Sequence, residues 1–107
     1  MKIRDAENFK RTGKFYVYIV ECSDGTYYTG YTLDIERRVV IHNNGKGAKY
    51  TRDRRPVKLV WWKEYRQFKP AFKLEKIIKK LTRLQKESLV KGRRLDKVLA
   101  DAGIKGR

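Results

Sequence analysis

The chain has 107 residues, of which 40% are hydrophobic and 12% aromatic. This length fits one domain, and the hydrophobic content supplies a modest core and argues against a disordered chain. Lys and Arg number 28 against 12 Asp and Glu, a net charge of +16, so the expected partner is a polyanion. Nucleic acid is preferred to an anionic membrane because the basic residues are spread over loops as well as helices.

Residues 1–14 are polar and basic without periodicity, and we expect them to form a basic tail. No segment reaches the roughly 20 apolar residues of a membrane span or resembles a signal peptide, so we expect a cytoplasmic protein without membrane partners. The single cysteine, Cys22, lies in an apolar run and is expected to be a small buried residue.

Residues 15–22 (FYVYIVEC) and 26–32 (TYYTGYT) are rich in aromatic and β-branched side chains. Separated by a Ser-Asp-Gly turn, they predict a β-hairpin. Tyr16, Tyr27 and Tyr31 are expected to serve packing, as aromatic residues in strands usually do.

The position of two further tyrosines depends on the turn, and two turns are possible. A two-residue loop at Asp24-Gly25 would place Tyr18 and Tyr28 on opposite faces of the hairpin. A three-residue loop over 23–25, with its glycine left-handed, would place both phenols on one face. It would also set Gly30 opposite Tyr18 and leave space over the ring for a phosphate.

The rest of the chain alternates between helical and strand patterns. The predicted elements, in order, are a helix over 35–44 capped by Asp34, a basic loop over 45–56, a strand over 57–65, a helix over 71–81 with Pro70 in its first turn, a helix over 82–91 capped by Thr82, and a short helix over 93–100. This order predicts an α+β fold, a small antiparallel sheet with helices against it. Residues 15–91 are expected to form the domain, and 92–107 either a packed final helix or a mobile basic tail.

Glu75 stands out in its predicted helix. Ala71, Leu74 and Ile78 line one side at helical spacing, and Glu75 projects into this apolar stripe. An ionised carboxylate there needs a cation or hydrogen bonds, which indicates a metal ligand or a catalytic group. The structural alternative is an ion pair with Lys79, four residues later.

The helix over 35–44 shows a similar contrast. With Ile35 and Val39 facing the core, Arg38 and His42 fall on or beside the same face, while Arg37 points to solvent. A histidine on an apolar face is usually a satisfied core residue. An arginine held there is rarer, and a fixed guanidinium suits the charge of a phosphodiester transition state.

Taken together and in order, these motifs resemble a GIY-YIG endonuclease domain. They are Y-V-Y at 16–18, Y-T-G at 28–30, E-R-R-x-x-x-H at 36–42 and E-x-x-I-K at 75–79. The loop G-K-G-A-K-Y-T followed by R-R-P resembles in particular the small single-domain bacterial members, which are related to the nuclease domain of the structure-selective Slx1 proteins. The resemblance covers roughly residues 14–91, and the ordered set is more specific than any single motif.

The resemblance implies a three-stranded antiparallel sheet flanked by helices and metal-dependent hydrolysis of DNA phosphodiesters. Tyr18 would help to activate the attacking water, and Tyr28 would assist it or position the phosphate. Arg38 would stabilise transition-state charge, His42 would support the site, and Glu75 would bind Mg²⁺ or Mn²⁺. Because a phenol has an ordinary pKa near 10, action as a base requires nearby positive charge, which we expect from Arg38 and the metal.

The basic loop is expected to bind the DNA backbone, with Gly30 giving the phosphate space; a solvated surface is the alternative. The expected substrate-binding residues are Gly30, Lys46, Lys49, Tyr50, Arg52, Arg54 and Arg55. We therefore expect an endonuclease acting on DNA, with selectivity for branched or single-stranded substrates as a further expectation. The alternative is a nucleic-acid-binding module on the same fold with weak or no catalysis.

Overall fold

A three-stranded antiparallel sheet organises the fold, as predicted. The computed structural model describes residues 12–104. The strands are β1 (Thr12–Glu21), β2 (Tyr27–Thr32) and β3 (Lys58–Gln67). They lie in the order β2-β1-β3, so β1 is central and both of its neighbours run antiparallel to it.

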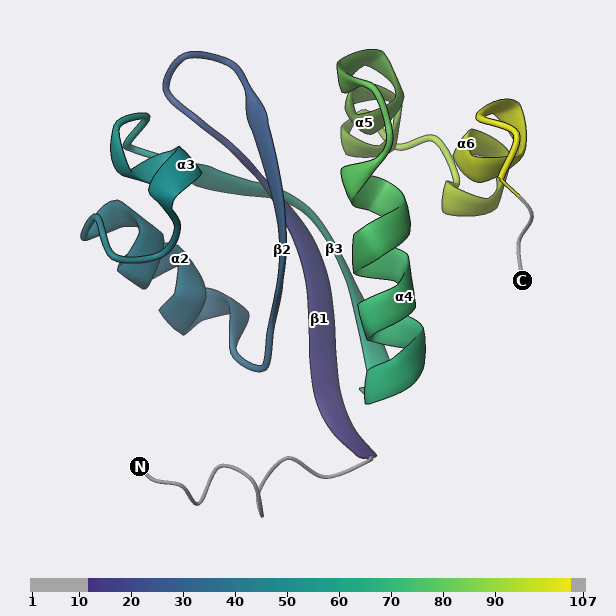
Figure 1. Cartoon of the computed structure of the whole chain (residues 1–107), viewed down its shortest axis with the longest axis horizontal. Coiled ribbons are helices and arrows are strands. Elements are labelled where there is room, and N and C mark those ends of the chain that lie inside the picture. The colour runs from purple at the N-terminus through teal and green to yellow at the C-terminus, as the bar shows by residue number, and fades with distance from the viewer. Residues whose placement is uncertain (1–11, 105–107) are drawn as a thin grey trace.

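Helices cover both faces of this sheet (Figure 1). The helices are α2 (Ile35–Asn43), α3 (Lys49–Arg52), α4 (Phe68–Lys79), α5 (Arg83–Val90) and α6 (Leu95–Asp101). In Figure 1, α2 and α3 lie on one side of the strands and α4 and α5 on the other, with α6 beyond α5. The α+β arrangement expected from the sequence is confirmed.

Each face of the sheet has its own apolar cluster because side chains alternate along β1. Phe15, Val17 and Ile19 point toward α4 and pack in the larger cluster with its buried stripe. Tyr18 and Val20 point the other way, into a smaller cluster that α2 covers. The smaller cluster is the one that carries the predicted site.

Local signals explain where several helices begin and end. Asp34 accepts a hydrogen bond from the backbone N–H of Arg37 at the start of α2, as predicted. Thr82 caps α5 through a capping box with Gln85. Pro70 lies in the first turn of α4, where its missing N–H leaves no helical bond unmade.

Some predicted boundaries are wrong. β1 starts at Thr12 rather than at residue 15, because β3 runs on to Gln67 and pairs with it. The rest of the expected tail, residues 1–11, lies outside the described residues. The loop over 45–56 contains α3, a four-residue helix too short to show a periodic pattern. Near the other end, Val98 of α6 is buried in the larger cluster, so this helix packs on the domain.

None of the helices between residues 12 and 104 combines the length and the apolar run that crossing a membrane would require.

Candidate active site

The turn of the hairpin brings two phenols to one face. The backbone N–H of Cys22 donates to the carbonyl of Thr26 at 2.8 Å, which leaves a three-residue loop, and Gly25 within it has a φ of +84°. Tyr18 therefore lies opposite Gly30, and Val20 opposite Tyr28. The register is the second of the two alternatives, so both phenols face α2.

Helix α2 presents His42 to these phenols. The Tyr18 hydroxyl lies 2.8 Å from Nε2 of His42, and both side chains are almost fully buried. The Tyr28 ring lies edge-on to the imidazole, with 5.4 Å between ring centroids. Arg38, one turn earlier in α2, is half-buried, whereas Arg37 is exposed. The predicted faces of this helix are confirmed.

Thr51 of α3 fixes the tautomer of His42. Its Oγ1 lies 2.8 Å from Nδ1 of the imidazole and donates to the carbonyl of Ala48 at 3.2 Å. Because this donation uses the single hydroxyl hydrogen of Thr51, we assign the imidazole hydrogen to Nδ1, which then donates it to Oγ1. Nε2 is then an acceptor, and Tyr18 donates its phenolic hydrogen to it.

Burial is the largest influence on the pKa values of both Tyr18 and His42. Burial raises the pKa of Tyr18 well above its ordinary value of 10.0, and this effect outweighs the opposing influence of Arg38. Arg38 lowers the pKa of Tyr18, as expected, but in the protein chain by itself burial has the larger effect, and the contribution expected from a metal stays a prediction. Burial, followed by the charge of Arg38, lowers the pKa of His42 below 6.5 and keeps its imidazole neutral at pH 7.

Two glycines make room for the hydrogen-bonded pair. A Cβ at Gly30 would lie within 3.0 Å of the Tyr18 hydroxyl, and one at Gly47 would lie equally close to the imidazole ring of His42. Gly30 therefore has a steric role against Tyr18 itself, beyond the predicted space for a phosphate. Gly47 and Thr51 were not singled out from the sequence, because their loop gives no sign of which side chain it will contact.

Glu75 lies in α4, on the far side of the sheet from α2, yet it is not turned to bulk water. Its side chain is 15% exposed, and its carboxylate lies 3.0 Å from Nζ of Lys79. The ion pair weighed as a structural alternative is thus present. Burial is the main cause of the raised pKa values of Tyr18 and Tyr31, and the negative charge of Glu75 is a smaller cause of both.

A metal ion at Glu75 would be a hydrated cation with few protein ligands, bound beside the ammonium group of Lys79. Between residues 12 and 104, no group of three or more His, Cys, Asp or Glu side chains could hold a metal ion. Glu75 would then act as a single carboxylate ligand, a pattern that suits Mg²⁺ or Mn²⁺ with water and phosphate oxygens. The buried Tyr31 hydroxyl lacks a hydrogen-bond partner within the described chain, and burial and Glu75 both raise its pKa. It is available to bind a water ligand of such a cation.

The predicted DNA-binding loop lies over the phenols, but its members differ in role. Tyr50 stacks on Tyr28 with 6.0 Å between centroids, and the guanidinium of Arg54 lies 4.0 Å above Tyr50. Arg54 also pairs with Asp24 of the hairpin turn at 3.0 Å, and Arg55 donates to a backbone carbonyl, so both hold the loop in place. The exposed cationic members are Lys46, Lys49, Arg52 and Arg55.

A second group of cations near Tyr28 was not found from the sequence. A cavity of about 190 Å³ is bounded partly by Tyr50, Arg83 and Lys86. Nζ of Lys79 lies 6.0 Å from the Tyr28 ring centroid. Burial, with the charge of Lys79 second, lowers the pKa of Lys86. These residues lie on helical faces that look solvated in sequence, and only the packing of α4 and α5 brings them to the hairpin and to Tyr50.

Comparisons with known proteins find similar chains that cover most of the described domain. The GIY-YIG catalytic domain matches residues 14–88, a range that includes both phenols, Arg38, His42 and Glu75. A UPF0213 protein of Halobacterium salinarum is 55% identical over 74 residues, which are 69% of this chain and 96% of the relative.

Two solution NMR structures are also similar. The UPF0213 protein BH0048 from Bacillus halodurans is 41% identical, with a TM-score of 0.50 over 86% of this chain and 99% of that one. The protein EF2693 from E. faecalis is 44% identical, with a TM-score of 0.53 over 77% of this chain and 88% of that one. The sheet and its flanking helices are therefore shared with solved relatives.

Proposed function

Because the chain belongs to the GIY-YIG catalytic domain family, we propose that it is a divalent-metal-dependent endonuclease that hydrolyses DNA phosphodiester bonds. The observation that carries the proposal is the buried 2.8 Å hydrogen bond between Tyr18 and His42. It lies on a face that Tyr28 and Arg38 share, within the field of Glu75. A net charge of +16 supports a polyanionic substrate.

The hydrogen bond gives the attacking water a route for its proton. As the water oxygen bonds to phosphorus, its proton passes to the Tyr18 oxygen while the Tyr18 proton passes to Nε2 of His42. Tyr18 stays neutral throughout, so its high pKa is no obstacle, and the neutral imidazole is the base. The Nδ1–H bond to Thr51 keeps the ring in the acceptor tautomer.

The remaining residues act on the phosphate. Arg38 stabilises the charge that develops on the phosphate oxygens, since the guanidinium of this half-buried residue acts electrostatically on both Tyr18 and His42. Tyr28 is more exposed than Tyr18 and assists the water or positions the phosphate. Glu75 would hold Mg²⁺ or Mn²⁺, and such an ion would supply Lewis-acid stabilisation of the phosphate.

A cleavage assay with matched controls tests this function. The substrates are single-stranded, duplex and branched DNA with Mg²⁺ or Mn²⁺, and the variants are Glu75→Ala and Arg38→Ala. Glu87→Ala is the control for Glu75, because Glu87 is also paired with a lysine four residues later. Arg37→Ala is the control for Arg38. We expect the two site variants to lose about 100-fold or more in rate and the controls to cut normally.

Cleavage by Glu75→Ala at the rate of Glu87→Ala would overturn the metal-ligand assignment. If none of the proteins cuts any substrate while all bind DNA equally, the enzyme proposal fails. Relative rates on the three DNA forms then decide the further proposal of selectivity for branched or single-stranded DNA.

A binding module without strong catalysis is the second candidate, favoured by the ion pair that engages the Glu75 carboxylate. Its affinity would come from the exposed Lys46, Lys49 and Arg52. In a gel-shift titration, the logarithm of affinity should fall linearly with the logarithm of salt concentration, because bound phosphates release counterions. Affinity that does not change with salt would contradict phosphate-dominated binding.

A further inference from the structure

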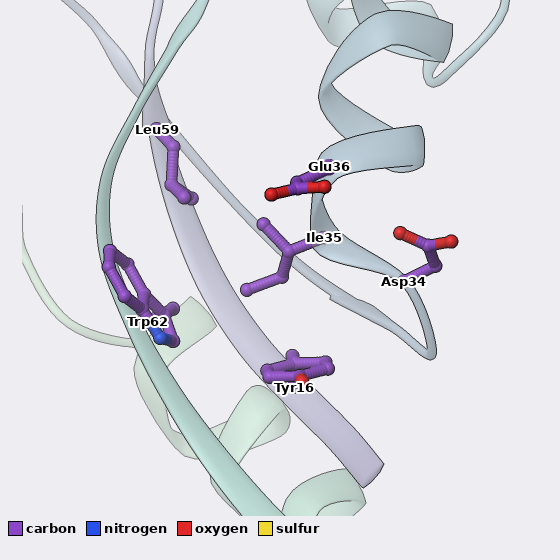
Figure 2. A pocket seen from close by; sticks show the side chains of 6 residues that line it. All are labelled: Tyr16, Asp34, Ile35, Glu36, Leu59 and Trp62. Carbon is purple, nitrogen blue, oxygen red and sulfur yellow. The ribbon is translucent and has the colours of Figure 1, made fainter.

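A cavity beside the Tyr18 site has no role in the proposed chemistry. It has a volume of about 410 Å³ and lies between strands β1 and β3 and the start of α2. Its lining residues, shown in Figure 2, are Tyr16, Asp34, Ile35, Glu36, Leu59 and Trp62. The volume lies within the range of small-ligand pockets, about 300 to 1,000 Å³.

The walls of this cavity on the sheet side are aromatic and close to the site. Trp62 is the cross-strand partner of Tyr18 on β3, and its side chain is 56% exposed. Tyr16 lies two residues before Tyr18 in β1 and so has the same face. Tyr16 and the exposed indole of Trp62 therefore lie on the same face of the sheet as Tyr18.

The charge of the cavity differs from that of the rest of the molecule. In a chain of net charge +16, its helix side carries the carboxyl groups of Asp34 and Glu36 (Figure 2). One oxygen of Asp34 accepts from the backbone of Arg37, and Glu36 is exposed. Carboxylates repel phosphate, but they accept hydrogen bonds from the amino groups of nucleobases. The lining suits a base and not its phosphate.

We propose that this cavity binds one unstacked nucleobase of the DNA strand whose phosphate lies at Tyr18. The base stacks on Trp62, and its exocyclic amino group donates to Glu36 or Asp34. The proposal rests on the proposed function and deepens it. A base inside a duplex is not available for stacking on protein, so the substrate strand is unpaired at this position. Adenine, cytosine and guanine are preferred to thymine, which lacks the amino group.

The test uses short single-stranded oligonucleotides without divalent metal, so that binding is measured without cleavage. One position at a time is made abasic, and fluorescence anisotropy gives the affinity for wild type and for Trp62→Ala. Phe72→Ala is the control, because Phe72 is also an exposed aromatic, at 41%, but lies on α4 away from this cavity.

We expect Trp62→Ala to weaken binding of the intact oligonucleotide by about tenfold, the typical effect of removing one stacked base. At one position along the oligonucleotide, removing the base and replacing Trp62 with alanine should together lower the affinity no more than either change alone. The reason is that both changes remove the same stacking interaction. Phe72→Ala should show no such coupling at any position. Additive decreases at every position would overturn the proposal.

Two further variants separate stacking from folding. Trp62→Phe keeps an aromatic ring and should retain most of the affinity, whereas Trp62→Leu keeps an apolar side chain and should lose it. Equal binding by these two variants would contradict a stacked base. Self-association that Trp62→Ala abolishes would instead identify a second copy of the chain as the occupant and would also overturn the proposal.

Glu36→Ala tests the role of the amino group. At the position where removal of the base and Trp62→Ala are non-additive, the wild type should bind adenine or cytosine more tightly than thymine. Glu36→Ala should lose this preference. An equal gain in affinity for all bases would show that Glu36 only repels phosphate. If the protein cleaves DNA but the effects of Trp62→Ala and of every abasic position are additive, this inference alone fails. If the effects are non-additive at one position but no DNA is cleaved, the proposed nuclease function alone fails.

Discussion

His42 is held through both ring nitrogens, and this double contact gives it one defined role. Thr51 accepts from Nδ1 and Tyr18 donates to Nε2, each at 2.8 Å. A purely structural histidine could also have hydrogen-bond partners at both ring nitrogens. Here, however, the partner of Nε2 is the phenol of Tyr18, a residue of the predicted site. Burial and the charge of Arg38 then keep the ring neutral and able to accept a proton.

The pKa of His42 should be measurable without ambiguity, because the sequence contains a single histidine. We expect an NMR titration of its imidazole to give a pKa below 6.5, and Arg38→Gln to raise that value by removing a repelling charge. The folded protein binds the proton less readily than the unfolded chain. Stability should therefore be full above pH 6.5 and fall as the pH drops through the folded-state pKa. A pKa above 6.5 would contradict the arrangement.

Thr51→Val should destabilise the protein, because valine keeps the shape of threonine but leaves the buried Nδ1–H of His42 without an acceptor. We expect the free energy of unfolding to fall by about 1 to 3 kcal/mol. Denaturant unfolding measures this change, and Thr51→Ser, which keeps the hydroxyl, is the control. If both variants were equally stable, the hydrogen bond to His42 would have no energetic importance.

Gly30→Ala and Gly47→Ala should disturb the Tyr18–His42 pair directly, because each new Cβ would collide with one ring of the pair. We expect a changed His42 resonance and reduced cleavage. Gly92→Ala is the control: it meets nothing within 4 Å but has a φ of +106°. That variant should lose stability through backbone strain while the His42 resonance stays where it is. An unchanged His42 resonance in the Gly30 and Gly47 variants would refute the steric explanation.

At the scale of single residues, helical periodicity predicted which side chains face inward, whereas the loop sequences did not. Helical spacing placed Arg38 and His42 on the inner face, and both are found there. The apolar stripe likewise drew attention to Glu75. Thr51 and Trp62 could not be assigned, because their importance comes from contacts with residues far away in the chain. Periodicity describes a face of an element and says nothing of what that face will meet.

At the scale of elements, turn and cap chemistry determined the site. The hairpin sequence allowed two loops, and the choice between them moves Tyr28 from one face to the other. Asp24 favours the longer loop because it accepts from both the backbone and the hydroxyl of Thr26. The caps of α2 and α5 were visible in the sequence, whereas α3 was not, since four residues cannot show a helical period.

The capping box of α5 should contribute measurably to stability. Thr82→Ala removes the acceptor for the backbone N–H of Gln85, and we expect the free energy of unfolding to fall by about 0.5 to 2 kcal/mol. Leu84→Ala is the control within the same turn, since Leu84 is exposed and its truncation should change stability by less than about 0.5 kcal/mol. Chemical denaturation of both variants compares them. Equal decreases would assign the effect to helix propensity instead of capping.

At the scale of the whole molecule, charge governs both stability and binding. A net charge of +16 repels itself in the folded state, and salt screens this repulsion. The same salt weakens the attraction to DNA. The two properties of the protein therefore depend on ionic strength with opposite signs.

Raising the salt concentration from about 50 to 200 mM should increase the melting temperature of the free protein while it lowers the affinity for single-stranded DNA. Thermal unfolding and anisotropy at matched salt concentrations measure the two effects. Lys49→Ala should reduce the salt slope of binding by about 0.7 for each phosphate that the lysine neutralises. A melting temperature that falls with added salt would show that attractive ion pairs outweigh the net repulsion.

The fold as a whole could be predicted from its elements and motifs, because strand and helix patterns are local. The distribution of cations could not, because Arg83 and Lys86 reach a cavity that Tyr50 also lines from a helix on the other side of the sheet.

The main chain at Gly30 and Gly47 bounds the Tyr18–His42 pair. A backbone wall has no alternative rotamer, so a mutation at either ring cannot be accommodated by a neighbour that swings aside. If the proposed function holds, changes in substrate preference should therefore arise at exposed positions such as Trp62 and Lys49, and changes at Tyr18 or His42 should be poorly tolerated.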